Sequence, residues 1–162
     1  MLFWKKTNSH KFKLFADYHQ FYLQDEKANG DLSASWTEQA TADLLAIAPR
    51  TIGVGTVRNT MVTVQVVVQT SAPEEKFAAW DHVVDCSIEI PTGVIVVAGC
   101  TDYFPDAARI KVKPGSYRAR VLYGGLGTLS EDGLEGEDCY HVILWSGEQT
   151  EVTVRKRRQG KS

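Results

Sequence analysis

From residue 51 onward, the chain consists of short segments rich in Val, Ile, Thr and aromatic residues. Branched and aromatic side chains of this kind favour extended backbone, because they pack well on a pleated sheet. Turn sequences such as Pro91-Thr92-Gly93, Pro114-Gly115 and Ser146-Gly147 separate the segments. Many short strands joined by close turns predict a mainly β fold, either an antiparallel β-sandwich or a flattened barrel. The strands predicted in this part of the chain are residues 51–57, 60–69, 83–90, 93–98, 109–112, 116–123, 139–145 and 148–155.

The first 50 residues add two strands and one short α-helix to this prediction. Residues 11–15 and 18–24 are predicted strands, and alternation in the second places Phe21 and Leu23 on one face. From residue 36 to residue 46, a capping hydroxyl, an early Glu and good helix formers predict the helix. We expect it to end before Pro49, because proline disfavours helical backbone in the residue ahead of it.

The composition is that of one soluble globular domain, with 162 residues of which 43% are hydrophobic and 23% are charged. A chain of this length buries a sizeable core without disulfides. Its longest apolar run, residues 64–68, is far shorter than the roughly 20 residues of a membrane helix, so we expect no membrane span. No apolar segment of the signal-peptide kind follows Lys5 and Lys6, and the three cysteines lack metal-type spacing. We therefore expect free thiols and a cytoplasmic location.

Charge is distributed unevenly along the chain. Residues 1–13 form a basic N-terminal segment and residues 155–162 a basic C-terminal tail, and neither contains an acid. The single β-sandwich domain between them, residues 14–154, holds nine basic and 20 acidic residues, a net charge of −11. Such a domain repels phosphate backbones, so we expect a basic protein partner and no direct binding of nucleic acid by this domain. We expect the tail to be a solvated end, with a nucleic-acid or membrane-surface patch as the alternative.

The sequence contains no recognisable motif for catalysis or for a cofactor. The Gly53-Val54-Gly55 segment lacks the third glycine and the following helix of a dinucleotide turn, and glycines that let a strand bend explain it. The four histidines stand singly, so they predict no metal site. Nothing local marks Cys86 or Cys100 as a nucleophile. We therefore expect a protein without a cofactor and without enzymatic activity.

The longest irregular segment, residues 124–138, is rich in glycine and in acids. Loops of this length in a compact domain are usually functional or mobile. Its carboxylates could chelate calcium, contact a basic partner or simply be solvated, although the residue order of a calcium-binding hand is absent. The residues that we expect to form an anionic binding face are Glu131, Asp132, Glu135, Glu137 and Asp138.

Asp102 and Tyr103 form a second candidate binding element, which we expect near the anionic face. Tyr103 and Phe104 either anchor a partner or fold back to cover the end of the sandwich. Two other functions stay open at this point. The protein could bind a small molecule or a carbohydrate in a pocket lined by Tyr103, Phe104 and tryptophans. It could also be a homodimer that pairs exposed strands.

Four short motifs, in a fixed order along the chain, carry a family resemblance. They are Tyr18-His19-Gln20-Phe21, Trp36-Thr37-Glu38 with Ala40, Arg58-Asn59-Thr60, and Lys113-Pro114-Gly115 with Tyr117. On these residues, the chain resembles the competence protein J family over roughly residues 17–123. The chain differs from the family type around residues 71–80, 100–108 and 124–138, and insertions of this kind are where recognition changes.

The resemblance implies a nuclease inhibitor or immunity protein. The best-known type in this family binds and silences a DNase during DNA uptake. We expect this chain to act by occluding the active site of its partner. A nuclease holds DNA in a positive groove, so negative charge on an inhibitor steers the encounter and excludes the substrate. The net charge of the domain has the sign that this mechanism requires.

Overall fold

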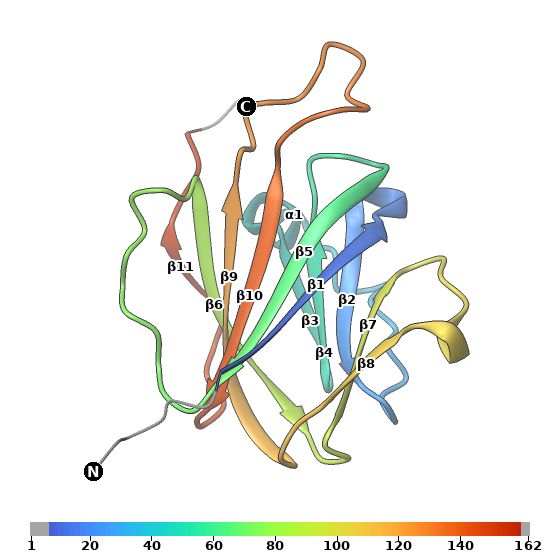
Figure 1. Cartoon of the computed structure of the whole chain (residues 1–162), viewed down its shortest axis with the longest axis vertical. Helices are drawn as coiled ribbons and strands as arrows, with labels where there is room; N and C mark the ends of the chain where they lie inside the picture. Colours follow the sequence, from blue (N-terminus) through green and yellow to red (C-terminus); the bar gives the residue numbers. More distant parts are fainter. Residues whose placement is uncertain (1–6, 160–162) are drawn as a thin grey trace.

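The computed structural model describes residues 7–159, which form the predicted strands and one short α-helix (Figure 1). Each predicted strand is present, although the last is confined to residues 153–156, and β3 is an additional strand. The elements follow the chain in the order β1 (Thr7–Phe15), the 3-10 helix η1 (Asp17–His19), β2 (Gln20–Asp25), α1 (Glu38–Asp43), β3 (Leu45–Ala48), β4 (Thr51–Gly55), β5 (Met61–Gln69), β6 (His82–Ile90), β7 (Val94–Gly99), the 3-10 helix η2 (Phe104–Asp106), β8 (Ala108–Lys111), β9 (Gly115–Gly124), β10 (Cys139–Ser146) and β11 (Thr153–Lys156).

The strands form two sheets that pack face to face (Figure 1). The larger sheet has the strand order β1-β5-β10-β9-β6-β11, and the smaller one has the order β3-β4-β2-β7-β8. Neighbouring strands run antiparallel, except that β5 and β10 are parallel. The two sheets are open, so the fold is the predicted β-sandwich and not a closed barrel.

The α-helix is shorter than predicted and is followed by a strand. Thr37 caps its N-terminus, with Oγ1 accepting a hydrogen bond from Ala40 N at 3.1 Å. The helix ends at Asp43, because Leu44 adopts left-handed backbone with a φ of 58°. The apolar residues that we expected to continue the helix form β3 beside β4, where Leu45 is buried. Burial in a sheet thus overrides the local helix preference.

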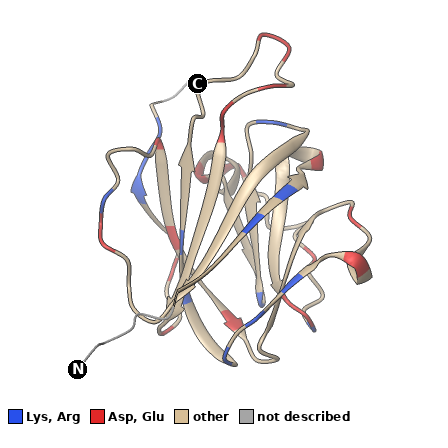
Figure 2. Ribbon diagram, in the orientation of Figure 1, with Lys and Arg blue, Asp and Glu red and all other residues tan. Residues whose placement is uncertain are grey.

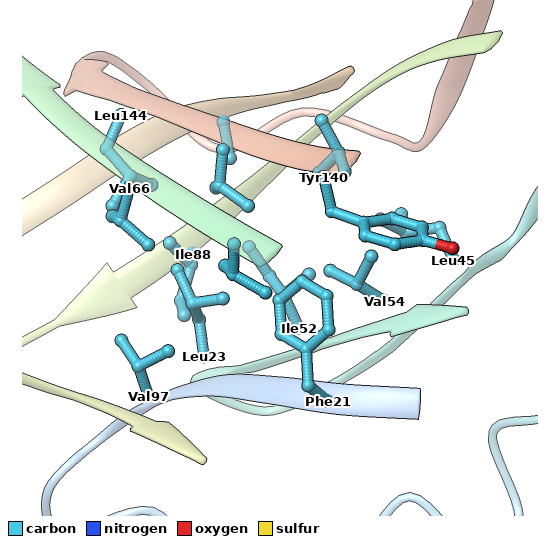
Figure 3. Close-up of a cluster of buried hydrophobic side chains, with 14 of the residues drawn as sticks. Phe21, Leu23, Leu45, Ile52, Val54, Val66, Ile88, Val97, Tyr140 and Leu144 are labelled. Atoms are coloured by element: carbon cyan, nitrogen blue, oxygen red, sulfur yellow. The ribbon is translucent and has the colours of Figure 1, made fainter. Parts of the chain in front are cut away.

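The core lies between the two sheets and consists of side chains that alternate along the strands (Figure 3). Phe21 and Leu23 of β2 point toward the larger sheet and are fully buried. Phe21 meets Tyr140 of β10 edge to face, with ring centroids 6.0 Å apart. Val66 of β5 and Leu144 of β10 complete this part of the layer. Burial of each such side chain contributes about 1.5–3 kcal/mol, so this layer holds the two sheets together.

A buried ion cluster lies on the other face of the larger sheet. Arg120 of β9 and Asp85 of β6 are 4% and 2% exposed and form two hydrogen bonds, at 2.8 and 2.9 Å. Arg155 of β11 donates to the same carboxylate at 3.0 Å and also pairs with Glu75. The Phe77 ring packs against both guanidinium groups. The segment between β5 and β6 therefore covers this face, and the charges beneath it are paired.

The described part of the basic C-terminal tail, residues 155–159, contacts the domain, while Arg155, Arg157 and Gln159 stay exposed to solvent as predicted. Arg157 pairs with Asp43 at 2.7 Å, at the end of α1. The backbone N–H of Arg158 donates to His82 Nδ1 at 3.1 Å. The charge of Arg157 is thereby paired within the domain, and Arg158 is attached to it through its backbone.

The outermost residues of both basic ends, 1–6 and 160–162, lie outside the described residues. The rest of the basic N-terminal segment, residues 7–13, belongs to β1. The predicted domain boundaries at residues 14 and 154 fall within β1 and β11. Among the helices in residues 7–159, none is long and apolar enough to cross a membrane.

Candidate functional site

Four segments meet at one end of the sandwich, where β1 ends and β5 begins (Figure 1). Ala16 N donates to Thr60 O at 2.8 Å, and Thr60 Oγ1 donates to Leu134 O at 3.3 Å. Cys100 Sγ donates to Asp17 O at 3.3 Å. Segments far apart in the sequence therefore share one end of the molecule. We call it the loop end, and it comprises residues 16–19, 56–60, 100–107 and 125–138.

The loop between β9 and β10 is a defined turn built around Asp132. The Asp132 carboxylate accepts hydrogen bonds from Ser130 Oγ at 2.6 Å and from Leu134 N at 3.0 Å. These bonds favour the charged form and lower the pKa of Asp132. At the base of the loop, Gly125 has a φ of +65°, and a Cβ there would lie 2.4 Å from Glu137 O. The loop therefore has a definite shape, and the Asp132 carboxylate is engaged within it.

Three glutamates of this acidic loop, Glu131, Glu135 and Glu137, have exposed side chains. None of them forms an ion pair with any residue that the structure describes. Figure 2 shows further acidic residues on η1 and on the segment between β7 and β8. The structure thus places three predicted carboxylates at the surface, where a basic partner can reach them.

Asp138, which we expected in the same anionic face, is buried instead. It is 2% exposed, and its Oδ1 lies 2.6 Å from Arg58 Nε. Its other oxygen accepts from Tyr140 OH at 2.7 Å, and that hydroxyl accepts from Val57 N at 2.9 Å. Burial, together with the hydrogen bond to Asp138, raises the pKa of Tyr140. Asp138 therefore fastens the acidic loop to β10 and to the residues before β5, and its charge does not face solvent.

Asp102 and Tyr103, the other predicted binding residues, also lie at the loop end. The segment that carries them is separated from the acidic loop by η1, so they are not next to the anionic face as expected (Figure 1). Both are exposed, Tyr103 by 71%. Asp102 Oδ2 accepts from Gly99 N at 2.7 Å, which shapes the turn after β7. Phe104 packs against the Arg109 guanidinium, at 5.3 Å from the ring centroid. Tyr103 is therefore a solvent-exposed ring and does not cover the end of the sandwich.

The turn η1 differs from the strand predicted there. Tyr18 and His19 have φ values of 57° and 58°, left-handed backbone that residues other than glycine rarely adopt. The Asp17 side chain accepts from Tyr18 N at 3.1 Å, and His19 N donates to Ala16 O at 3.0 Å. Thr56 N donates to His19 O at 2.9 Å. The local sequence predicts a strand at Tyr18 and His19, so the turn was not expected. Tyr18 was singled out only as part of a family motif.

Exposed apolar side chains gather at the loop end. Among the large hydrophobic residues that are exposed in the described part of the chain, all but Ile47 lie in or next to its four segments. The neighbouring carboxylates add negative charge to this surface, and aromatic residues and methionine are enriched at protein interfaces. These residues are Phe15, Tyr18, Met61, Tyr103, Phe104 and Leu134.

The ligand pocket that we considered is not assembled from the expected aromatic residues. A hollow of about 280 Å³ includes Phe104, Asp102 and Tyr22, but neither Tyr103 nor a tryptophan lines it. A larger hollow of about 900 Å³ lies between the acidic loop and the C-terminal residues. Trp80 lines it, but Tyr103 and Phe104 do not. Within residues 7–159, no group of three or more His, Cys, Asp or Glu is placed to hold a metal ion. Neither hollow therefore brings together Tyr103, Phe104 and the tryptophans.

The motifs that carry the family resemblance have structural roles in this chain. Trp36 Nε1 donates to Gln20 Oε1 at 3.0 Å and ties the segment before α1 to β2. Tyr117 OH donates to Lys113 O across the turn into β9. Tyr18 is an exception, because its side chain is 70% exposed. Trp36 and Tyr117 thus make contacts within the domain, whereas Tyr18 is a surface residue.

Comparison with known proteins shows a likeness at the level of the fold. No family model matches the chain, and no curated protein matches it. The fold is similar to that of ComJ from Bacillus subtilis, described as an inhibitor of the DNA degrading activity of NucA, with a TM-score of 0.66 and 16% identity over 89% of this chain and 99% of ComJ. It is also similar to the crocagin biosynthetic gene J product, with a TM-score of 0.57 and 13% identity over 90% of this chain and 100% of that one. The predicted resemblance to the competence protein J family is therefore confirmed for the fold.

Proposed function

We propose that this protein is a non-enzymatic inhibitor of a DNA-degrading enzyme and that its loop end binds the basic DNA groove of that enzyme. The observation that carries the proposal is the joint exposure of unpaired carboxylates and apolar side chains at this one end. The fold of ComJ, an inhibitor of DNA degradation, supports it. We place the protein in the cytoplasm, because its three cysteines are free, as expected in a reducing compartment.

Electrostatics provides the physical basis for this mechanism. Arg155 and Arg157 neutralise acids inside the domain, whereas Glu131, Glu135 and Glu137 keep their charge at the surface. A negative surface draws a positive groove toward it and raises the rate of association. Once bound, the loop end fills the groove and excludes DNA. Inhibition by occlusion requires no catalytic residues in the inhibitor.

Cleavage of a fluorescent DNA duplex by a lysate of the source cells tests this function. Purified protein is added at increasing concentration, and the rate of cleavage is measured at low ionic strength. We expect cleavage to fall to a few per cent of its starting rate. Cleavage that is unchanged at a large excess of protein contradicts the proposed function.

Two matched triple variants locate the binding surface within the same assay. Glu131→Gln, Glu135→Gln and Glu137→Gln together remove three charges at the loop end. Glu89→Gln, Glu148→Gln and Glu151→Gln remove three exposed charges elsewhere on the domain. We expect the first variant to need about tenfold more protein for half-inhibition and the second to match the wild type. Equal behaviour of the two variants contradicts the assignment of the loop end.

A further inference from the structure

Tyr18 is 70% exposed and lies in a turn whose backbone is bonded to neighbouring segments of the loop end. Phe15 and Met61 are paired across β1 and β5 beside its turn. Thr60 accepts a hydrogen bond from Ala16 N and donates one to Leu134 O, so it joins the acidic loop to the residues just before this turn. A few interface residues carry most of the binding energy, and tyrosine is among the residue types enriched there.

The turn that carries Tyr18 is held in a conformation that it would not adopt alone. Two consecutive residues with positive φ persist only where the surroundings hold them, and such strain clusters at functional sites. The backbone of His19 is bonded to both Ala16 and Thr56, and the carbonyl of Asp17 accepts from Cys100 Sγ. The position of the Tyr18 backbone is therefore set before a partner arrives, which reduces the entropy lost on binding.

The loop end that carries Tyr18 also carries several acidic residues. Grooves that bind nucleic acid combine positive residues along the phosphates with apolar surfaces on which the bases stack. A surface with carboxylates and an exposed aromatic ring is complementary to such a groove, because the carboxylates share the charge of the phosphates and the ring can stack as a base does. The acidic residues concerned are Asp17, which precedes Tyr18 in the turn, Glu131 and Glu135 on the acidic loop, and Asp102 and Asp106 on the segment between β7 and β8.

On the basis of the proposed inhibitor function, we propose that Tyr18 is the aromatic anchor of the complex and occupies the surface on which the enzyme holds a base of its DNA substrate. The carboxylates around it meet the residues that hold the phosphates. The two contributions differ in their response to salt. Contact with the tyrosine ring sets the dissociation rate and persists at high ionic strength, whereas the carboxylates act mainly on association and are screened.

The same DNA-cleavage assay, run at low and at moderate salt, separates these contributions. Tyr18→Ala is the test variant, Tyr18→Phe keeps the ring, and Ile47→Ala removes an exposed apolar side chain away from the loop end. We expect Tyr18→Ala to raise the half-inhibiting concentration about 10- to 100-fold at both salt concentrations. Tyr18→Phe and Ile47→Ala are expected to stay within threefold of the wild type. Thermal unfolding confirms that each variant is folded.

The outcomes distinguish this inference from the function on which it rests. If the wild type inhibits and Tyr18→Ala inhibits equally well, the anchor is wrong and the inhibitor function stands. If the effect of Tyr18→Ala disappears at moderate salt, as expected for the glutamate variant, the contact is electrostatic and the anchor is again wrong. If the wild type does not inhibit, both proposals fail together.

Discussion

The acidic loop and the basic C-terminal residues carry opposite charges, and the fold treats them in opposite ways. Arg155 and Arg157 are drawn into ion pairs with Asp85 and Asp43, acids of the domain itself. The glutamates of the acidic loop form no ion pair within residues 7–159. Charge at one region stabilises the fold, and charge at the other stays available for a partner.

This difference shows why net charge along the sequence is an incomplete guide to the surface. The sequence places five basic residues at the C-terminal end and a net charge of −11 in the domain. In the structure, Arg155 and Arg157 pair with acids of the domain, and the loop end is one of the regions in which acidic residues stay exposed (Figure 2). Partner charge is therefore better inferred from the unpaired residues than from the total.

The largest effect is expected where the paired charges are most deeply buried. Arg120→Ala leaves the Asp85 carboxylate buried with Arg155 as its remaining cationic partner, and it removes the packing of the Arg120 guanidinium on Phe77. Loss of one member of a buried pair costs about 3–5 kcal/mol of unfolding free energy. Urea unfolding measures this change. A loss below about 1 kcal/mol would show that the cluster is not a stabilising element of the sheet.

A smaller effect is expected at the boundary between the two regions. Asp138→Asn weakens the contact with Arg58 and the hydrogen bond from Tyr140, so we expect a loss of about 2–3 kcal/mol. Glu137→Gln, one residue earlier and exposed, is the matched control and should change stability by less than about 0.5 kcal/mol. Chemical unfolding measures the free energy of unfolding of both variants. Equal losses would contradict the claim that Asp138 supports the fold while Glu137 does not.

Stability is expected to depend on pH through the histidine that receives the C-terminal residues. Burial lowers the pKa of His82 from its ordinary value of 6.5, and its Nδ1 accepts from Arg158 N, which requires the neutral ring. Below about pH 6.5, the unfolded chain takes up a proton that the folded chain resists, so stability falls as the pH falls. Burial also lowers the pKa of His141 in the same direction.

Urea unfolding at pH 7.5 and at pH 5.5 measures this dependence. We expect the wild type to lose stability at the lower pH and His82→Gln to lose less over the same interval, because only the share of His141 then remains. Identical pH dependence in the two proteins would contradict the role of His82 in holding the C-terminal residues.

The smallest effect on stability is expected in the acidic loop. The triple variant Glu131→Gln, Glu135→Gln and Glu137→Gln should unfold within about 0.5 kcal/mol of the wild type, since these side chains are exposed. Thermal unfolding provides the measurement. A clear loss of stability would mean that these glutamates support the fold, and their role in binding would then lack its physical basis.

Much of the fold was predictable from local patterns. Alternating residues such as Val62, Val64 and Val66 have one buried face and therefore mark their strand clearly. The end of the helix was not predictable, because Leu44 and Leu45 suit a helix as well as a strand. Their place was decided by burial beside β4, an interaction that no local window contains.

The candidate site was predictable only in part. Glu131, Glu135 and Glu137 were found from the density of acids in a glycine-rich loop, and the structure leaves them exposed. Asp138 has the same chemistry and differs only in its contact with Arg58, a residue 80 positions earlier in the chain. The position of Tyr18 depends on a left-handed turn that its sequence does not signal. Long-range contacts and backbone strain thus set the limit of prediction here.

The most direct test of the central claim is amide hydrogen exchange of the protein alone and in complex with the DNA-degrading enzyme of the source cells. The enzyme is isolated by its retention on the immobilised protein and verified by its cleavage of the fluorescent duplex. We predict that binding slows exchange in residues 16–19, 100–107 and 125–138 and leaves residues 87–93 and 146–151 unchanged. Protection confined to the latter two segments, or no protection at the loop end, would contradict the account.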